Sequence, residues 1–226
     1  MKKVGFDKNF KEVIFLFNKK KINYWLCHGT LLGIVRNKNL IPWDHDVDLA
    51  VWTNRKTKKN IYSMLLNKGY KKKKKFFKGD NLLTMIKKGG REIDVNFYEL
   101  SKSKEFAFQR HFYYKNFFIR FVDVISKSNN YNGNYKEIIR NFKFMSTFFK
   151  KIKKILIKNG MYYKEYGYMT PSHFFMNLKT IKVKKLKLRV PKNAINYVKL
   201  IYGKSWKKPK KKFNWITDSD ISQNLK

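Results

Sequence analysis

The chain has 226 residues, of which 43% are hydrophobic and 17% aromatic, so it can bury the core of one domain or of a catalytic core with a modest appendage. Its 53 Lys and Arg residues face only 15 Asp and Glu residues, which gives a formal net charge of +38. The single cysteine, Cys27, excludes an internal disulfide and a cysteine-rich zinc site, and it favours a reducing compartment.

Lysine supplies most of the positive charge, with 46 Lys to seven Arg. Arg is the better ligand for phosphates and base edges, and the joint abundance of Lys, Asn, Ile, Phe and Tyr is what A/T-rich coding produces. We therefore interpret the charge mainly as compositional, with no specific nucleic acid expected. It still favours peripheral contact with an anionic membrane and helps to hold an anionic substrate.

The N-terminal segment starts with basic residues, but polar residues interrupt its apolar run and make it too short for a signal peptide. No stretch approaches the roughly 20 apolar residues of a membrane span. We therefore expect a cytoplasmic protein, in peripheral contact with a membrane at most.

Helices and strands alternate through the first third of the chain. Apolar residues spaced by three and four predict an amphipathic helix over residues 6–20, and "YWLCH" predicts a short buried strand. The stretch "GTLLGIVRNK" predicts a turn into a helix that Thr30 can cap, "VDLAVW" predicts a strand, and residues 56–67 predict a second amphipathic helix.

After the lysine run at residues 71–75, "NLLTMIK" and "EIDVNFYEL" predict two strands joined across "KKGG". The predicted fold class is α/β (α+β), with a mixed sheet flanked by helices and a helical C-terminal part. We expect residues 1–100 to form a catalytic core and residues 101–226 a mostly helical accessory region that completes its pocket.

The second half of the chain has a looser pattern. Helices are predicted near residues 135–158 and 193–203, and the final dozen residues are expected to be a tail. Tyr202, Gly203 and Trp206 are candidates for closing a pocket from this half.

Acidic residues gather in "WDHDVDL", which is unusual in so basic a chain. Asp46 and Asp48 are two residues apart, so on a strand their side chains leave the same face, while Val47 and Leu49 enter the core. Asp44 shares that parity if the strand begins early. Neighbouring carboxylates remain ionised at low cost only with a cation between them, and oxygen ligands of this kind suit Mg²⁺ or Mn²⁺.

A further carboxylate, Asp94, lies in "REIDVNF" between two apolar residues that point the other way. Two acids on one strand with a third on the next are typical of metal-dependent phosphoryl or nucleotidyl transfer. Gly29 precedes the acids at a turn where backbone can approach a phosphate, and Thr30 offers a hydroxyl donor.

The stretch "GTLLGIVRNKNLIPWDHDVDL" resembles the defining motif of the LicD/fukutin family: Gly-Thr or Gly-Ser, Leu-Leu-Gly, an Arg, and Ile-Pro-Trp-Asp-x-Asp-x-Asp. The dense match covers Trp25 to Trp52. A weaker similarity to the family's Val-Pro, Tyr-Gly and Pro pattern lies in "VPKNAINYVKLIYGKSWKKP", whereas most of residues 101–180 has no counterpart.

The resemblance implies a nucleotidyltransferase-type fold and Mg²⁺-dependent transfer from a CDP-activated donor, such as CDP-choline or CDP-ribitol. A phosphocholine or polyol-phosphate group would pass to a hydroxyl of a glycan or glycolipid, and CMP would leave. The matching residues are Asp44, Asp46 and Asp48 for the acidic motif, Asp94 for the third acid, Gly29 and Thr30 for the nucleotide-side turn, and Arg36 for a phosphate or substrate contact.

One position departs from the family pattern. His45 stands where bacterial members often have Asp, and on a strand it faces away from the acids. Trp25, Trp43 and Trp52 flank the motif, and Trp43 is the candidate among them for substrate binding. His28, beside Gly29, is interpreted as a packed or capping residue rather than a base or ligand. His111 and His173 lie in aromatic contexts without ligand spacing, so we assign no chemistry to them.

Two other functions compete with this hypothesis. A nucleotidyltransferase that moves NMP from an NTP to a nucleic acid, small molecule or protein shares the fold and would use the positive charge. A non-catalytic basic module that binds RNA or a membrane predicts salt-dependent binding, but it leaves the acidic cluster unexplained.

Overall fold

The computed structural model describes residues 6–73 and 81–224, which form two compact units. Within those ranges the first unit comprises residues 6–111 and 167–223, and the second comprises residues 112–166. The start of the chain and Lys74 and Lys75 of the lysine run lie outside the described residues.

This division differs from the expected boundary at residue 100. The strands β5 (Glu92–Leu100) and β6 (Phe106–Tyr114) pair as an antiparallel hairpin, so the chain continues past that point without a break. Residues 167–223 then return to the first unit, which is consequently built from both ends of the chain.

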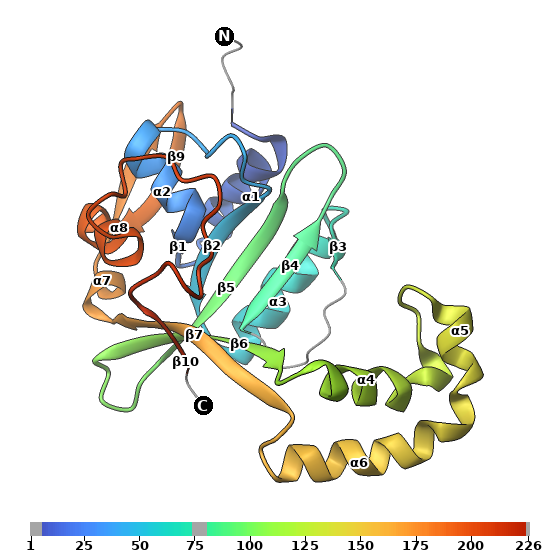
Figure 1. The fold of residues 1–226 in the computed structure, drawn as a ribbon. Helices are drawn as coiled ribbons and strands as arrows, with labels where there is room; N and C mark the ends of the chain where they lie inside the picture. The colour runs from blue at the N-terminus through green and yellow to red at the C-terminus, as the bar shows by residue number, and fades with distance from the viewer. Residues whose placement is uncertain (1–5, 74–80, 225–226) are drawn as a thin grey trace. The chain divides into compact units, whose positions relative to one another are not determined.

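The mixed sheet that the sequence predicts is present, and β2 and β5 form a parallel pair within it (Figure 1). β2 (Asp46–Trp52) runs parallel to β5, while β1 (Tyr24–Leu26) and β4 (Leu82–Ile86) run antiparallel to β2 and β5 respectively. The sheet also includes β3 (Lys71–Lys72), β6, β7 (Tyr163–Pro171) and β10 (Ser222–Asn224). The strand order is β1-β2-β5-β6-β7-β10, with β4 also paired to β5 and β3 paired to β4.

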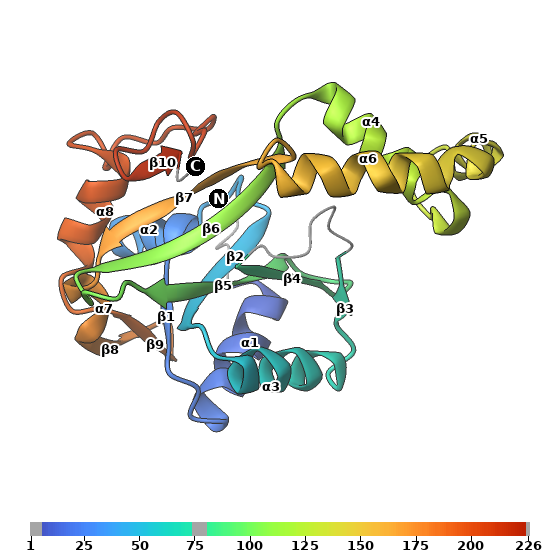
Figure 2. The same ribbon diagram turned by 90° about the horizontal axis from the view of Figure 1, so that it is seen from below.

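Two helices of the first unit lie together on one face of β2, β4 and β5 (Figure 2). α1 (Lys8–Lys19) begins after Asp7, whose carboxylate accepts the N–H groups of Asn9 and Phe10, and α3 (Arg55–Leu66) begins after the capping residue Asn54. Their apolar residues cover Val47, Leu49, Ile93 and Val95, all of which are fully buried. The predictions for these two helices and for the β4–β5 hairpin are confirmed.

The other elements of the first unit pack around β1, β2 and α1. α2 (His28–Asn37) contacts β2 and α8 (Ala194–Tyr202), and α8 follows the hairpin of β8 (Leu178–Val183) and β9 (Leu186–Pro191). A short helix, α7 (His173–Met176), precedes that hairpin. The prediction that Thr30 caps the second helix is wrong, because α2 already begins at His28 and its N-cap position is Cys27.

The second unit is a small helical arrangement with a core of its own. It contains α4 (Phe117–Ser126), α5 (Lys136–Asn141) and α6 (Ser146–Lys158), with the 3₁₀ turns η1 (Ser128–Asn130) and η2 (Lys143–Met145) between them. Val122, Ile125 and Phe149 form its buried centre. No helix in the described ranges of the chain has the length and apolar character needed to cross a membrane.

The unit is also held by a buried carboxylate. Asp123 accepts hydrogen bonds from Tyr114 (2.6 Å), Lys153 (2.6 Å), Lys127 and Tyr162. Burial alone would raise the pKa of Asp123, but these four donors outweigh it and lower the pKa to about 2.

Candidate active site

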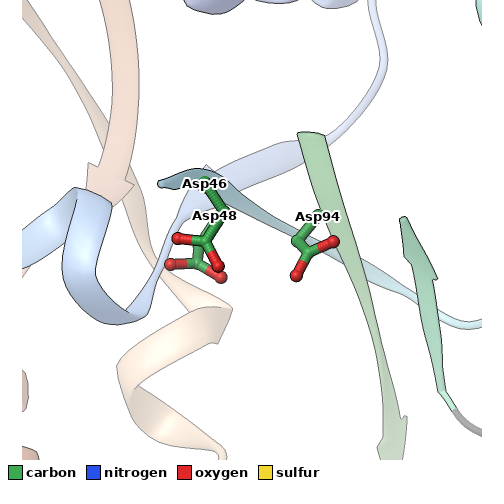
Figure 3. Close-up of side chains that lie close together, drawn as sticks. All are labelled: Asp46, Asp48 and Asp94. Atoms are coloured by element: carbon green, nitrogen blue, oxygen red, sulfur yellow. The ribbon is translucent and has the colours of Figure 1, made fainter. Parts of the chain in front are cut away.

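Three carboxylates converge on one face of the parallel strand pair. In the β2–β5 register Asp48 is the partner of Asp94, and paired residues on parallel strands project from the same face. Asp46, two residues before Asp48, shares that face. Each of the three acids has a carboxylate oxygen within 4.8 Å of one from each of the others, and Figure 3 shows the carboxylates pointing into a common space.

The position of these charges is electrostatically costly. Burial, followed by the charges of Asp46, Asp94 and Asp44, raises the pKa of Asp48 well above its usual range. Burial and the neighbouring Asp46 likewise raise the pKa of Asp44 to about 7. Carboxylates that repel one another in this way favour a cation between them.

Asp48 is fixed by contacts from two elements, α2 and β5. Its backbone N–H donates to the Thr30 hydroxyl (2.7 Å), which joins α2 to β2, and its Oδ1 accepts from the Asn96 side-chain amide (3.4 Å). The same amide lies 3.5 Å from the Cys27 sulfur. Burial raises the pKa of the Cys27 thiol well above its usual range, so Cys27 acts as a packed, neutral side chain.

A chain of amides continues from Asp48 to a histidine. The Gln109 amide donates to Asn96 Oδ1, and His28 Nε2 lies 2.9 Å from Gln109 Oε1. Because that amide oxygen only accepts, His28 must carry its proton on Nε2, which leaves Nδ1 as the unprotonated nitrogen. Burial lowers the pKa of His28 to about 4, and its ring stacks on Tyr168 at 4.7 Å, so it is a neutral positioning residue.

Some of the other residues that the sequence suggested for the site line the pocket, and others are buried beneath it. Gly29 is packed so closely against Asp44 that a Cβ there would collide with the Asp44 carboxylate. Arg36 and Trp43 line the same pocket as the acids, and Arg36 donates to the Trp206 carbonyl oxygen (3.4 Å). Thr30 is buried and does not line the pocket, and its contact with the site is the hydrogen bond that its hydroxyl accepts from the Asp48 backbone.

The acids open into a pocket of about 490 Å³ that belongs entirely to the first unit. Its walls combine aromatic side chains with three lysines, Lys208, Lys210 and Lys211. Lys210 also pairs with Asp218 at 2.8 Å. The aromatic lining residues are Trp43, Tyr168, Tyr202, Trp206, Phe213 and Trp215.

Several pocket residues have no sequence motif of their own. The expectation of a tail over the final dozen residues is wrong, because Trp215 and Asp218 line the pocket and Trp215 packs on His111 and Tyr168 at about 5 Å. The only available signal was compositional, since Phe213 and Trp215 are large aromatics in a lysine-rich segment.

Two of the flanking tryptophans have another role. Trp25 is fully buried, and Trp25 and Trp52 pack against Phe175 in the core, whereas Trp43 lines the pocket. Tyr202 and Trp206 line it as the sequence suggested, and Gly203 ends α8 outside the lining residues.

The three-acid cluster fits a divalent cation. Carboxylate oxygens are the ligands that Mg²⁺ and Mn²⁺ prefer, and the three side chains already offer one oxygen each within mutual reach. Asp46, Asp48 and Asp94 are therefore the residues that would hold the ion. Asp44 lines the pocket beside them but lies outside this group of three.

Comparisons with known proteins agree with the motif. The family model for the LicD/FKTN/FKRP nucleotidyltransferase domain matches residues 21–122. Human ribitol-5-phosphate transferase FKTN is 24% identical over 216 residues, covering 94% of this chain and 36% of FKTN. Human ribitol 5-phosphate transferase FKRP is 42% identical over 40 residues, 18% of this chain and 8% of FKRP.

Among solved structures, the lincosamide antibiotic adenylyltransferase LnuA with bound lincomycin aligns over 81% of this chain and 78% of its own, with a TM-score of 0.43 and 12% identity. The chain spans about a third of the length of FKTN. The family match includes the acidic motif of β2 and the third acid of β5. Over residues 21–122, somewhat less than half of its length, the chain is similar to the LicD/fukutin family of nucleotidyltransferase domains.

Proposed function

We propose that this chain is a metal-dependent phosphotransferase that moves a polyol-phosphate or phosphocholine group from a CDP-linked donor to a hydroxyl of a glycan or glycolipid, releasing CMP. The observation that carries the proposal is the convergence of Asp46, Asp48 and Asp94 in a pocket that also holds three lysines. A diphosphate-containing substrate needs both a cation site and additional positive charge. The names of FKTN and FKRP favour ribitol phosphate as the first group to test.

The chain's own residues have distinct tasks in this reaction. Lys208, Lys210 and Lys211 would attract and orient the donor's phosphates, and the aromatic walls would stack on the base. The acceptor oxygen forms a bond to the β-phosphorus while the bond from that phosphorus to the bridging oxygen breaks, and CMP leaves with that oxygen. Asp94 is the proposed acceptor of the hydroxyl proton.

A bound Mg²⁺ or Mn²⁺ would supply positive charge to the phosphate oxygens during transfer. Asp46, Asp48 and Asp94 would hold it, while Thr30 and Asn96 fix Asp48 in place. A larger side chain at Gly29, near the start of α2, would displace the Asp44 carboxylate from its position.

The test is a donor screen with the full chain. CDP-ribitol, CDP-glycerol and CDP-choline are incubated with Mg²⁺, with Mn²⁺ or with EDTA, and release of CMP is measured by chromatography. The proposal expects release from at least one donor with a divalent cation, and loss of release in Asp46→Asn. Glu92→Gln is the matched control, because Glu92 is the β5 register partner of Asp46 but pairs with Lys73 at 2.7 Å and is not a pocket residue.

The same screen separates the competing functions. Pyrophosphate release from an NTP, with NMP attached to an acceptor, would establish nucleotidyl transfer in place of the proposed reaction. Binding to RNA that falls steeply with salt and is unchanged in Asp46→Asn, with no CMP release from any donor, would identify a basic binding module. CMP release that persists in EDTA would refute the metal's role.

A further inference from the structure

The second unit carries aromatic side chains that remain largely exposed around its small core. The buried centre consists of Val122, Ile125 and Phe149, with Met145, Ile152 and Leu156 packed around it. Other apolar residues of the same helices remain in solvent, which is unusual because monomers rarely expose large contiguous apolar patches.

On α4 these residues form one stripe. Phe117 is 78% exposed, and Phe118 and Phe121 are 56% and 41% exposed. Phe121 lies four residues after Phe117 and three after Phe118, so all three leave the same side of the helix. Ile119 is buried on the opposite side of α4, and the buried Val122 and Ile125 border the stripe.

A second stripe runs along η2 and α6. Phe144, Phe148 and Ile155 are exposed, and their spacings of four and seven residues place them on one side of the helix. The two stripes border the same core residue, because the buried Phe149 packs edge-to-face on both Phe121 and Phe148 with ring centroids 5.5 Å apart in each case. We call the combined set the aromatic surface: Phe117, Phe118, Phe121, Phe144, Phe148 and Ile155.

The shorter helix α5 also has exposed apolar residues. Ile138 lies within it, Tyr135 and Phe142 lie at its two ends, and all three are exposed.

Basic residues surround the aromatic surface. Residues 112–166 hold twelve Lys and Arg against three acids. Two of those acids, Asp123 and Glu165, are buried, and Glu137 lies beside Lys136. On α6, Lys150, Lys151, Lys154 and Lys158 are exposed on the side next to the Phe148–Ile155 stripe.

We propose that the aromatic surface docks the second unit onto a bilayer that contains anionic lipids. Helices with aromatic residues on one side and lysines beside them lie in the interface of such bilayers: the rings enter the headgroup boundary while the ammonium groups meet lipid phosphates. With 10 and 13 residues, α4 and α6 are too short to span a bilayer, so they lie along it.

Charge complementarity favours an anionic bilayer over a second copy of the chain or a nucleic acid as the partner of the aromatic surface. A second copy of the chain would place one strongly basic surface against another, which repels. A nucleic acid would satisfy the lysines but would leave the apolar side chains of the aromatic surface in water. An anionic bilayer satisfies both features at once.

The test is co-sedimentation of the full chain with phosphatidylcholine vesicles that contain either no anionic lipid or about 30 mol% phosphatidylserine. We expect binding to the anionic vesicles, weak binding to neutral vesicles, and loss of most binding in about 0.5 M NaCl, where surface charges are screened. The variant Phe117→Gln/Phe148→Gln should lower the partition coefficient on anionic vesicles by about tenfold or more.

Matched controls come from the first unit. Phe15→Gln replaces a 61% exposed phenylalanine of α1 and should leave vesicle binding unchanged. A charge variant, Lys150→Gln/Lys154→Gln/Lys158→Gln, should weaken binding more than Lys56→Gln/Lys59→Gln/Lys68→Gln, which removes the same charge from exposed positions of α3 and the residues after it. The charge variant keeps the proposal testable if the aromatic variant fails to fold.

Three results would overturn the proposal. One is equal vesicle binding by the parent and the two second-unit variants. Another is equal binding to neutral and anionic vesicles. The third is an oligomer, detected by sedimentation velocity without vesicles, that Phe117→Gln/Phe148→Gln dissociates, since this would assign the aromatic surface to a second copy of the chain.

Discussion

Asp48 and Asp94 are register partners on the parallel strands β2 and β5, and this pairing brings acids 46 residues apart in sequence onto one face of the sheet. Because Asp48 is buried beside three other carboxylates, its charge opposes folding in the absence of a cation. The site is therefore arranged for binding at the expense of stability, and a variant can separate the two effects.

Asp48→Asn should raise stability in EDTA while it removes activity. Loss of one repelling charge should increase the free energy of unfolding by about 1 kcal/mol, measured by urea denaturation. CMP release should fall by more than the roughly 10–100-fold that is typical for loss of a group supporting a metal ligand. Lower stability in EDTA together with full activity would contradict this assignment, and Glu92→Gln should change neither quantity.

Asn96→Ala should weaken metal binding without altering the carboxylate set. The Asn96 amide holds Asp48 Oδ1, and Gln109 holds Asn96, so truncation frees the Asp48 side chain to rotate. The Mg²⁺ concentration for half-maximal CMP release should rise about 10–100-fold. Asn81→Ala is the control, since Asn81 is also buried and bonds a carboxylate, Glu99, outside the pocket. If both variants need the same increase in Mg²⁺ concentration, Asn96 does not position Asp48 for metal binding.

Lys211→Gln should raise KM for the CDP-linked donor about tenfold with a smaller effect on kcat, because an attraction to the donor's phosphates is lost on binding. Lys211 lines the pocket, whereas its exposed neighbour Lys212 is not among the lining residues. Lys212→Gln removes the same single positive charge from outside the pocket, so KM should stay near the parent value. Matching KM increases in the two variants would mean that only the overall charge matters.

The second unit should lose stability in acid through Asp123. Its pKa is lowered to about 2, below the unfolded value of 3.8, so its stabilising effect is complete above about pH 4 and disappears as pH falls toward 2. That contribution is on the order of 2 kcal/mol. Urea denaturation at pH 7 and pH 2.5, followed by circular dichroism, measures it.

At pH 7, Asp123→Asn should destabilise by about 3 kcal/mol, because it leaves the partly buried Lys153 without its carboxylate. Glu137→Gln removes an exposed acid from the same unit and should change stability by less than about 0.5 kcal/mol. If the two variants unfold at the same urea concentration, the Asp123 cluster does not hold the unit together.

Short-range patterns in the sequence determined much of the first unit. The spacing of Phe10, Val13 and Phe17 predicts α1, and the alternation around Asp46 and Asp48 predicts which side chains of β2 face the core. These predictions succeed because helix and strand periods are local, and a buried face imposes them on the sequence directly. The family motif from Gly29 to Asp48 likewise lies in one continuous stretch.

Only the tertiary structure could decide what the distant segments contribute. Nothing in the sequence near Gln109 or Trp215 indicates that one supports Asp48 through Asn96 and the other forms a wall of the pocket. Their positions depend on the β5–β6 pairing and on the return of residues 167–223 to the first unit. The exposed aromatic side of α4 also could not be predicted from the sequence. Phe and Lys are abundant throughout the chain, so composition does not distinguish a buried ring such as Phe149 from an exposed ring such as Phe117.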